Sequence, residues 1–367
     1  GYVKEFPDLM KRITPIIKEN RNLTIITNAG GLRPEQCAKV VAEILRNDGL
    51  GDVKIGFVLG DDISDMLPNL VSNQSLKHMD TGQAIDAIAP KIIAANAYLG
   101  VDGIVRCLQK GANIIITGRV ADACLTIAPC MHAFHWDSGN YDLISAGMIA
   151  GHLIECGAQV CGGNYSGVKN FLLNSPGYPI CQMNHDGTFY ITKEATSDGC
   201  VSVGTVSEQL IYEIGDPKHY LTPDVDCDFT SVKLKQAGSH SVFVSNAKGR
   251  KPTDTFKISI AYDDGYKCSN TLFVYGHNAY EKAKECFEII QSQIRQEGIQ
   301  LTNIIAEYLG SGTTLPIPPN VNSNGSKEIV LRISASATNK SNLMRFSKLF
   351  APLITSGPTG VSGYTSG

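Results

Sequence analysis

The sequence lacks long apolar runs and an excess of charge of either sign. None of its apolar runs reaches the roughly 20 residues that a membrane-spanning helix needs, and residues 1–7 lack the apolar stretch of a secretory signal. The formal net charge is −3, which provides no positive surface for nucleic acid or for an anionic membrane. We therefore expect neither a membrane nor a nucleic acid among the partners.

Paired cysteines and nucleotide-binding motifs are absent as well. The 11 cysteines include no Cys-x-x-Cys pair, and the closest spacings are Cys124 to Cys130 and Cys156 to Cys161. A disulfide framework would be dense and even-numbered, and a zinc site would show tight pairs. No strand end fits Gly-x-Gly-x-x-Gly or Gly-x-x-x-x-Gly-Lys-Ser/Thr. We therefore expect reduced thiols in a cytoplasmic protein, with no metal site and no evident cofactor.

The composition is that of an ordinary globular protein, with 43% hydrophobic and 18% charged residues. A chain of 367 residues is too long for one compact core and suggests two domains. In the first half, short apolar runs alternate with helical patterns, which predicts a mostly parallel sheet. The expected strands are 23–27, 53–59 and 113–117, and the expected helices are 34–47, 81–97, 103–110 and 142–156.

The second half reads differently, with strands in runs followed by helices. Strands are expected within 178–191, as a hairpin, and over 231–234, 241–245, 255–262 and 328–334, with helices over 203–214, 279–296 and 341–350. We therefore predict an α/β domain over residues 1–168, built on a mostly parallel sheet with helices on both faces. A smaller α+β domain follows over residues 169–367.

Two of the expected strands end in similar sequences. Residues 23–31 and 113–122 both run through Ile-Ile-Thr into a turn of small residues followed by a helix. In an open α/β sheet, ligands bind beyond the carboxyl ends of the strands, where helix N-termini present free N–H groups. Arg119 lies at the second turn, and its planar fork suits a carboxylate or a phosphate. We expect Arg119 to hold such a group and Asp122 to orient Arg119, the alternative being a purely structural Arg119–Asp122 pair.

Further binding candidates lie at the same turns. N–H groups around three glycines would assist the arginine, and Asn28 would donate a hydrogen bond to a developing oxyanion. The glycines have an equal alternative explanation in turn geometry alone. Gln83, which follows a helix cap in Asp80-Thr-Gly-Gln83, is a further candidate to face the ligand. The candidate substrate-binding residues at this stage are Arg119, Asn28, Gly30, Gly31, Gly118 and Gln83.

The expected helix over 142–156 carries the best acid–base candidates. His152 and Glu155 are three residues apart and therefore lie on one face of the helix. Histidine titrates near neutral pH, and a carboxylate one turn away fixes its tautomer. The alternative is a buried histidine that its neighbour satisfies, which carries about half the weight. With Asp122, these two residues are the predicted catalytic set.

A larger set of short motifs runs along the chain from about residue 23 to its end. These motifs are Thr27-Asn-Ala-Gly-Gly31, Asp80-Thr-Gly-Gln83, Asn96-Ala-Tyr-Leu-Gly100, Thr117-Gly-Arg-Val-Ala-Asp122, Gly151-His-Leu-Ile-Glu-Cys156, Gly162-Gly-Asn164, Thr205-Val-Ser-Glu-Gln-Leu-Ile-Tyr-Glu213, Asp216-Pro217, Tyr220-Leu-Thr-Pro-Asp-Val225 and Gly357-Pro-Thr-Gly360. Together they resemble the acyclic terpene utilisation protein AtuA family. The resemblance adds Asn164 to the substrate-binding candidates and implies further segments before Gly1 and beyond Gly367.

The resemblance implies a metabolic context, because the family is associated with bacterial degradation of acyclic terpenoids, alongside enzymes that act on branched acyl-CoA thioesters. Two hypotheses follow. The first is an enzyme of the hydratase, isomerase or lyase type that applies acid–base chemistry to an acyl-CoA or a carboxylated intermediate. The second is a non-catalytic binding or assembly subunit that works with an acyl-CoA carboxylase. We favour the enzyme, because polar residues at strand ends more often serve chemistry than docking. Its partners would be a small-molecule substrate, a CoA thioester, and further copies of itself in a homo-oligomer.

Overall fold

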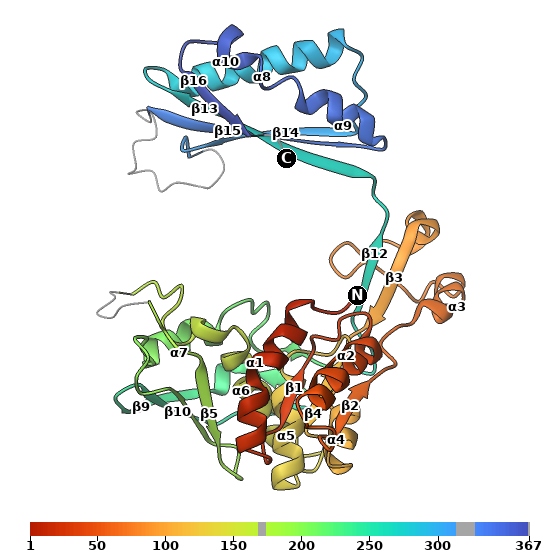
Figure 1. Ribbon diagram of the computed structural model, residues 1–367, viewed down its shortest axis with the longest axis vertical. Coiled ribbons are helices and arrows are strands. Elements are labelled where there is room, and N and C mark those ends of the chain that lie inside the picture. The colour runs from red at the N-terminus through yellow and green to blue at the C-terminus, as the bar shows by residue number, and fades with distance from the viewer. Residues whose placement is uncertain (168–173, 313–326, 366–367) are drawn as a thin grey trace. The chain divides into compact units, whose positions relative to one another are not determined.

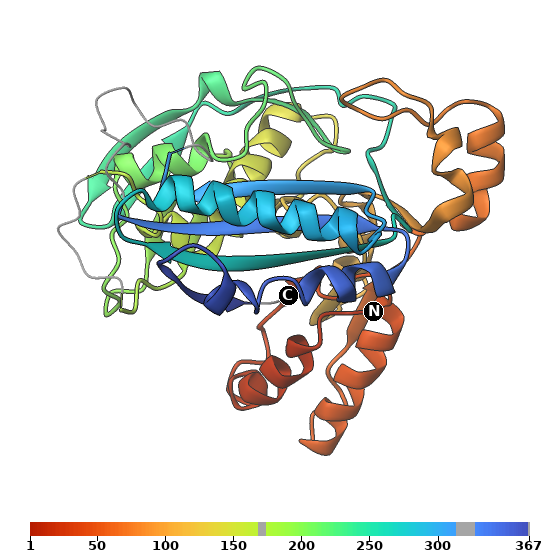
Figure 2. The ribbon, with the colours of Figure 1, turned by 90° about the horizontal axis from the view of Figure 1, so that it is seen from above.

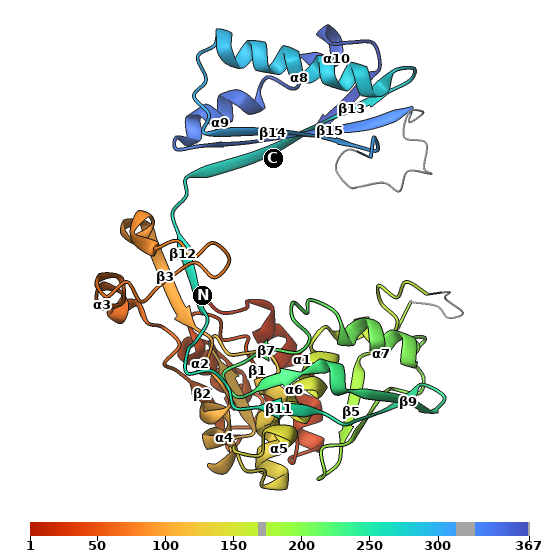
Figure 3. The same ribbon diagram turned by 180° about the vertical axis from the view of Figure 1, so that it is seen from behind.

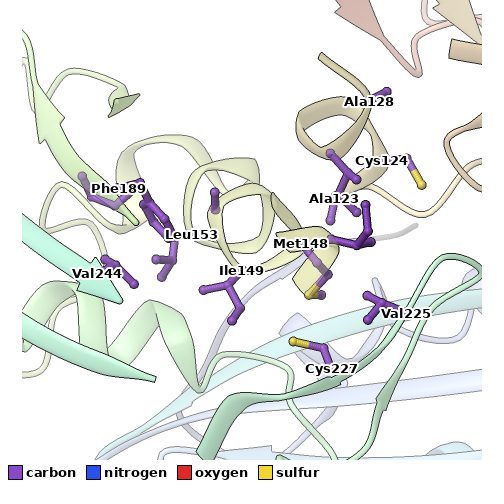
Figure 4. Packing of buried hydrophobic residues seen from close by; sticks show 14 of the residues in the cluster. Ala123, Cys124, Ala128, Met148, Ile149, Leu153, Phe189, Val225, Cys227 and Val244 are labelled. Atoms are coloured by element: carbon purple, nitrogen blue, oxygen red, sulfur yellow. The ribbon is translucent and has the colours of Figure 1, made fainter. Parts of the chain in front are cut away.

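The computed structural model describes residues 1–167, 174–312 and 327–365 (Figure 1). The chain divides into two compact units, Gly1–Ala261 and Tyr262–Gly367. The boundary that we expected between residues 168 and 169 lies outside the described residues. Side chains from both sides of it nevertheless share one hydrophobic core in the first unit, where Ile149 and Leu153 pack with Phe189 and Val244 (Figure 4).

A three-stranded parallel sheet organises the start of the first unit. Its order is β1 (Ile25–Thr27), β4 (Ile114–Thr117) and β2 (Ile55–Val58), with β4 in the centre. Ile114 and Ile116 pack with α1 (Glu5–Glu19) and α2 (Pro34–Asn47) on one face. Ile115 packs on the other face with α4 (Asp102–Gln109), α5 (Cys124–Phe134) and α6 (Tyr141–Glu155). Because successive side chains of a strand point to opposite faces, the apolar run of β4 fits a sheet covered on both sides, as predicted.

The other sheets of the first unit are antiparallel, so the expectation of a mostly parallel sheet holds only for the three strands above. Strands that are joined by hairpins or short loops pair as antiparallel neighbours, because only parallel neighbours need a long crossover connection. One sheet has the order β5 (Pro179–Met183), β6 (Phe189–Lys193), β10 (Ser241–Ser245) and β9 (Lys233–Gly238), and the other has β11 (Lys248–Arg250), β8 (Asp226–Asp228) and β7 (Tyr220–Leu221). Helix α7 (Val203–Leu210) precedes β7.

The prediction of a helix over residues 81–97 is wrong. This part of the chain forms short helical turns and then a strand, β3 (Ile92–Ala97), which pairs with β12 (Ile258–Tyr262). Pro90 interrupts the helical pattern. Beyond it, Ala95 and Ala97 are buried in a small core with Ile63, and their backbone groups bond to the segment that follows β2. Tertiary pairing therefore overrides the helix preference of the alanines. A short helix, α3 (Leu67–Ser72), lies between β2 and β3.

The second unit is one antiparallel sheet with helices on a single face (Figures 2 and 3). Its elements are β13 (Tyr266–Tyr275), α8 (Ala279–Gln296), β14 (Asn303–Leu309), β15 (Glu328–Ala337), α9 (Lys340–Ser347), α10 (Leu353–Ser356) and β16 (Val361–Thr365). The strand order β14-β15-β13-β16 is that of a split β-α-β arrangement. Leu272, Leu331 and Ile333 form the core with Phe346 and Phe350. The α+β character expected for the end of the chain is present in this unit.

Two helices begin and end where the sequence predicted, namely Pro34–Asn47 and Ala279–Gln296. Both are amphipathic, so the periodicity of their apolar residues marks them clearly. Within the described ranges of the chain, none of the helices combines the length and the apolar content that crossing a membrane requires.

Candidate functional site

The two similar strand ends meet at one edge of the parallel sheet. Strands β1 and β4 are direct neighbours, with Thr27 opposite Ile116, so their carboxyl ends lie side by side. The Nδ2 of Asn28 donates a hydrogen bond of 2.7 Å to Oδ1 of Asp122, which is 94 residues further along the chain. This contact places the residue after β1 against the start of α5. The meeting point expected from the sequence therefore exists.

Asp61, in the segment that follows β2, supports the turn that carries Arg119. Its carboxylate is 4% exposed and accepts hydrogen bonds from the backbone N–H of Arg119 and from Nδ2 of Asn96, both at 3.0 Å. The sequence placed Asp61 at a strand end but gave it no role. Among the described residues, the guanidinium of the exposed Arg119 has no hydrogen-bond or ion-pair partner. The expected orientation of Arg119 by Asp122 is thus replaced by a backbone contact to Asp61.

The three glycines of these turns are explained by packing within the chain. A Cβ on Gly30 would lie 2.4 Å from the carbonyl oxygen of Thr117, and one on Gly118 would lie 2.6 Å from Oδ1 of Asp61. Gly31 has φ of +55°, a left-handed conformation that favours glycine, and its N–H donates to the carbonyl of Asn28. Turn geometry and close packing therefore account for them without a ligand.

Close packing of α6 on α5 brings the acid–base candidates to the same place. Gly151 lies against Ala123, where an added Cβ would come within 2.7 Å of the Ala123 Cα. Figure 4 shows α6 beside the segment that carries Ala123. Glu155 lies one turn beyond Gly151, and its charge therefore influences the carboxyl group of Asp122. The pKa of Asp122 is raised, first by partial burial of its carboxyl group and next by the charge of Glu155, against the opposing effects of Arg119 and Asn28.

The predicted pair of His152 and Glu155 forms, with 3.1 Å between Nδ1 and Oε1. The two side chains differ in exposure, at 2% for His152 and 28% for Glu155. The imidazole packs on the ring of Phe229, and its Nε2 has no partner among the described residues. The contact to the carboxylate of Glu155 makes Nδ1 the donor nitrogen of the ring. Glu155 is therefore the member of the pair that reaches the surface.

Tyr220 completes the cluster, although no role for it was predicted from the sequence. Its ring centroid lies 6.1 Å from that of His152 and 5.2 Å from that of Phe229. Burial raises the pKa of Tyr220 to about 12, with further contributions from the charges of Glu155, Asp122 and Glu213. The hydroxyl group is thus neutral at physiological pH and lies in the field of several carboxylates.

A buried contact fixes the loop after Tyr220. Oδ1 of Asp224 accepts the backbone N–H of Val101 at 3.0 Å, and the thiol of Cys124 lies 3.1 Å from Oδ2. The pKa of Asp224 is raised, chiefly by burial. Cys124 begins α5, so this contact ties the loop to the same helix start that presents Asp122. The segment that follows Tyr220 is therefore anchored beside α5.

Two further candidates lie elsewhere. Gln83 is exposed in the segment before β3, and its carbonyl accepts the N–H of His78. Asn164 is exposed in the loop after α6. Neither has a described contact with the cluster of Asn28, Arg119, Asp122, Glu155 and Tyr220, which we call the carboxylate cluster.

No three metal-binding side chains converge within the described parts of the chain. Two small cavities, of about 180 and 80 Å³, are lined by other residues, such as Asp142 and Arg21. The carboxylate cluster is therefore defined by its polar side chains at the edge of the sheet. The chemistry that the cluster supports depends on these polar side chains.

One of the comparisons with known proteins identifies the family of the chain. The sequence model of the acyclic terpene utilisation family protein AtuA matches residues 1–367, which is the whole chain. No curated protein and no solved structure matches it significantly. The match covers both units, including all the residues of the carboxylate cluster. The chain belongs to the acyclic terpene utilisation protein AtuA family.

Proposed function

We propose that this protein is an enzyme that applies acid–base chemistry to a branched acyl-CoA thioester or to a related carboxylated intermediate. The observation that carries the proposal is the convergence of two strand ends, joined by the Asn28–Asp122 hydrogen bond of 2.7 Å, with α6, which packs on Ala123 through Gly151. Carboxyl ends of parallel strands are the usual place for substrates in α/β proteins. The family supports a place in acyclic terpene utilisation.

Arg119 supplies the binding part of this proposal. Its backbone is held by Asp61, so the turn is fixed. Its guanidinium makes no ion pair among the described residues, so its donors are free for a carboxylate or phosphate of the substrate. Asp122 lies close enough for the charge of Arg119 to lower its pKa, although other effects dominate. An anion bound by Arg119 would thus lie beside the proton-transfer groups.

Glu155 and Asp122 supply the proton-transfer part. Glu155 reaches the surface, and Nδ1 of His152 holds its Oε1 at 3.1 Å, so His152 acts as a positioning residue. Asp122 has a raised pKa and Glu155 has a hydrogen-bond donor, so the two carboxyl groups differ in environment. Two carboxyl groups in different environments are a common arrangement for an acid and a base in one site.

The test is turnover of a panel of substrates by purified variants. The panel contains 3-methylbutanoyl-CoA, 3-methylbut-2-enoyl-CoA and a carboxylated counterpart. We expect Glu155→Gln to lower kcat by about 10²–10⁴-fold, the usual contribution of a positioned acid–base group. Arg119→Ala should lower kcat/KM by about 10–100-fold, since it removes a charge-assisted hydrogen bond.

Matched controls separate these roles from general damage. Glu43→Gln and Arg12→Ala change exposed residues on α2 and α1 and should leave turnover unchanged. A loss below about tenfold in either site variant would contradict its assigned role. A wild-type protein that shows no turnover alone, but binds stably to an acyl-CoA carboxylase, would favour the non-catalytic assembly subunit instead.

A further inference from the structure

Tyr220 lies beside the buried histidine that holds Glu155. Strand β7 pairs Tyr220 with Cys227, and its ring contacts those of His152 and Phe229, which also contact each other. Among the described residues, its hydroxyl group makes no hydrogen bond. A phenol held by its ring and left free at its oxygen is a fixed donor, because two aromatic contacts determine where the O–H lies.

The charges of neighbouring carboxylates act on this hydroxyl group. After burial, Glu155 and Asp122 make the next contributions that raise the pKa of Tyr220, and so they help to keep the phenol neutral. A neutral phenol is a suitable donor to an enolate oxygen.

We propose that the hydroxyl group of Tyr220 holds the oxygen of an enolate that Glu155 generates by removing the α-proton of an acyl thioester. This inference rests on the proposed function and narrows it to carbonyl substrates with an α-hydrogen. The carboxylate of Glu155 takes the proton as the Cα–H bond breaks. The electron pair forms a C=C bond, and the carbonyl π electrons move to the oxygen. Return of a proton from Glu155 to Cα reverses the step, so no oxidant or other reactant is needed.

The geometry assigns a distinct part to each group. Glu155 receives its hydrogen bond from the buried His152 and acts as the base. Tyr220 acts as a donor and keeps its proton during the step. Arg119, on the turn after β4, would hold a carboxylate or phosphate remote from the reacting carbon.

The experiment follows exchange of the α-protons of 3-methylbutanoyl-CoA in D₂O by mass spectrometry. Tyr220→Phe should exchange about 10²–10³-fold more slowly than the wild type, the usual loss for one oxyanion donor. Tyr190→Phe is the matched control, because Tyr190 is also half-buried and packs on a phenylalanine ring, 5.1 Å away, outside the cluster. It should exchange like the wild type.

A second probe separates a donor role from a structural one. Acetoacetyl-CoA ionises readily, and its enolate has an absorption band in the near ultraviolet. The wild type should bind it and increase this band. Tyr220→Phe should bind it with a similar Kd but with a much smaller band. A variant that had merely lost its local structure would lose binding as well.

The outcomes distinguish this inference from the proposed function. Equal exchange rates in Tyr220→Phe and Tyr190→Phe would overturn it. It is also overturned if the wild type turns over a substrate with dependence on Glu155 but exchanges no α-proton, in which case the proposed function stands. If Glu155→Gln and Arg119→Ala keep full turnover, the proposed function itself fails.

Discussion

Two of the histidine–carboxylate pairs described in the first unit have nearly equal lengths but lie in different surroundings. His152 and Glu155 lie 3.1 Å apart, and His219 and Asp226 lie 3.0 Å apart. The first histidine is 2% exposed, whereas the second is 55% exposed. In the second pair, Nε of Arg250 also binds Oδ2 of Asp226 at 3.1 Å, so that carboxylate has a cation beside it.

The difference shows that the contact distance alone does not decide the chemistry. Burial by itself would raise the pKa of Asp226, but hydrogen bonds from Arg250 and His219 outweigh it, and the pKa is lowered. Among the described residues, Glu155 has no arginine or lysine as an ion-pair partner and instead acts on Asp122, whose pKa is raised. A carboxylate neutralised by arginine serves structure, whereas neighbouring carboxyl groups in different environments suit proton transfer.

The largest expected difference between the two pairs is in stability. His152→Ala should lower the free energy of unfolding by about 2–5 kcal/mol, because it removes a large buried side chain. His219→Ala should change it by less than about 1 kcal/mol, as for other exposed ion pairs. Urea unfolding of the two variants and the wild type measures both values. Equal losses would mean that burial does not distinguish the pairs.

A smaller effect is expected from Gly151→Ala, which tests the packing that brings Glu155 to Asp122. The new Cβ would meet the Cα of Ala123 at 2.7 Å, whereas Gly147→Ala meets the Cα of Ile127 at 3.2 Å. Overpacking of this kind costs about 1–3 kcal/mol. We expect Gly151→Ala to lose more stability and more turnover than Gly147→Ala. Thermal unfolding and the kcat of both variants provide the check, and a tolerated Gly151→Ala would show that the approach of α6 is not critical.

The smallest expected effect is that ionisation of Asp122 and ionisation of Asp226 change the stability of the fold in opposite directions. The raised pKa of Asp122 means that its ionised form destabilises the fold, and this cost grows as the pH rises through the raised value. The lowered pKa of Asp226 has the opposite effect. Its ionised form stabilises the fold at pH values above the ordinary carboxyl range, and this stabilisation is lost as the pH falls below that range. At pH 7, Asp122→Asn should therefore stabilise the protein, by less than about 1 kcal/mol because the residue is exposed. Asp226→Asn should destabilise it.

Chemical unfolding between pH 7 and pH 4 measures this contrast. The gain from Asp122→Asn should shrink toward acid pH, since the carboxyl group then becomes protonated in both states. A loss of stability in Asp122→Asn at neutral pH would contradict the assigned environment of Asp122.

Much of the local structure could be predicted from the sequence, because it depends on neighbours along the chain. Helix Pro34–Asn47 has proline at its start and a clear apolar stripe, and Ala279–Gln296 is equally periodic. The strand over residues 92–97 could not be predicted, because its partners are distant segments. Helix Glu5–Glu19 was not predicted, although Phe6, Met10 and Ile17 mark its buried face.

The candidate site was predictable in part for the same reason. Residues at strand ends, such as Asn28 and Arg119, are visible from a short apolar run and the turn that follows it. His152 and Glu155 are visible from their spacing on one helix. Tyr220 was not visible, because nothing in its own segment shows that β7 lies beside α6.

The sequence by itself determined that a parallel β-α-β region with polar strand ends exists, and that His152 and Glu155 share a helix face. Only the tertiary structure decided that Asp122 pairs with Asn28, that Asp61 holds the backbone of Arg119, and that His152 is buried. The physical reason is that hydrophobic patterning is local, whereas burial and electrostatic environment depend on residues that meet across the fold.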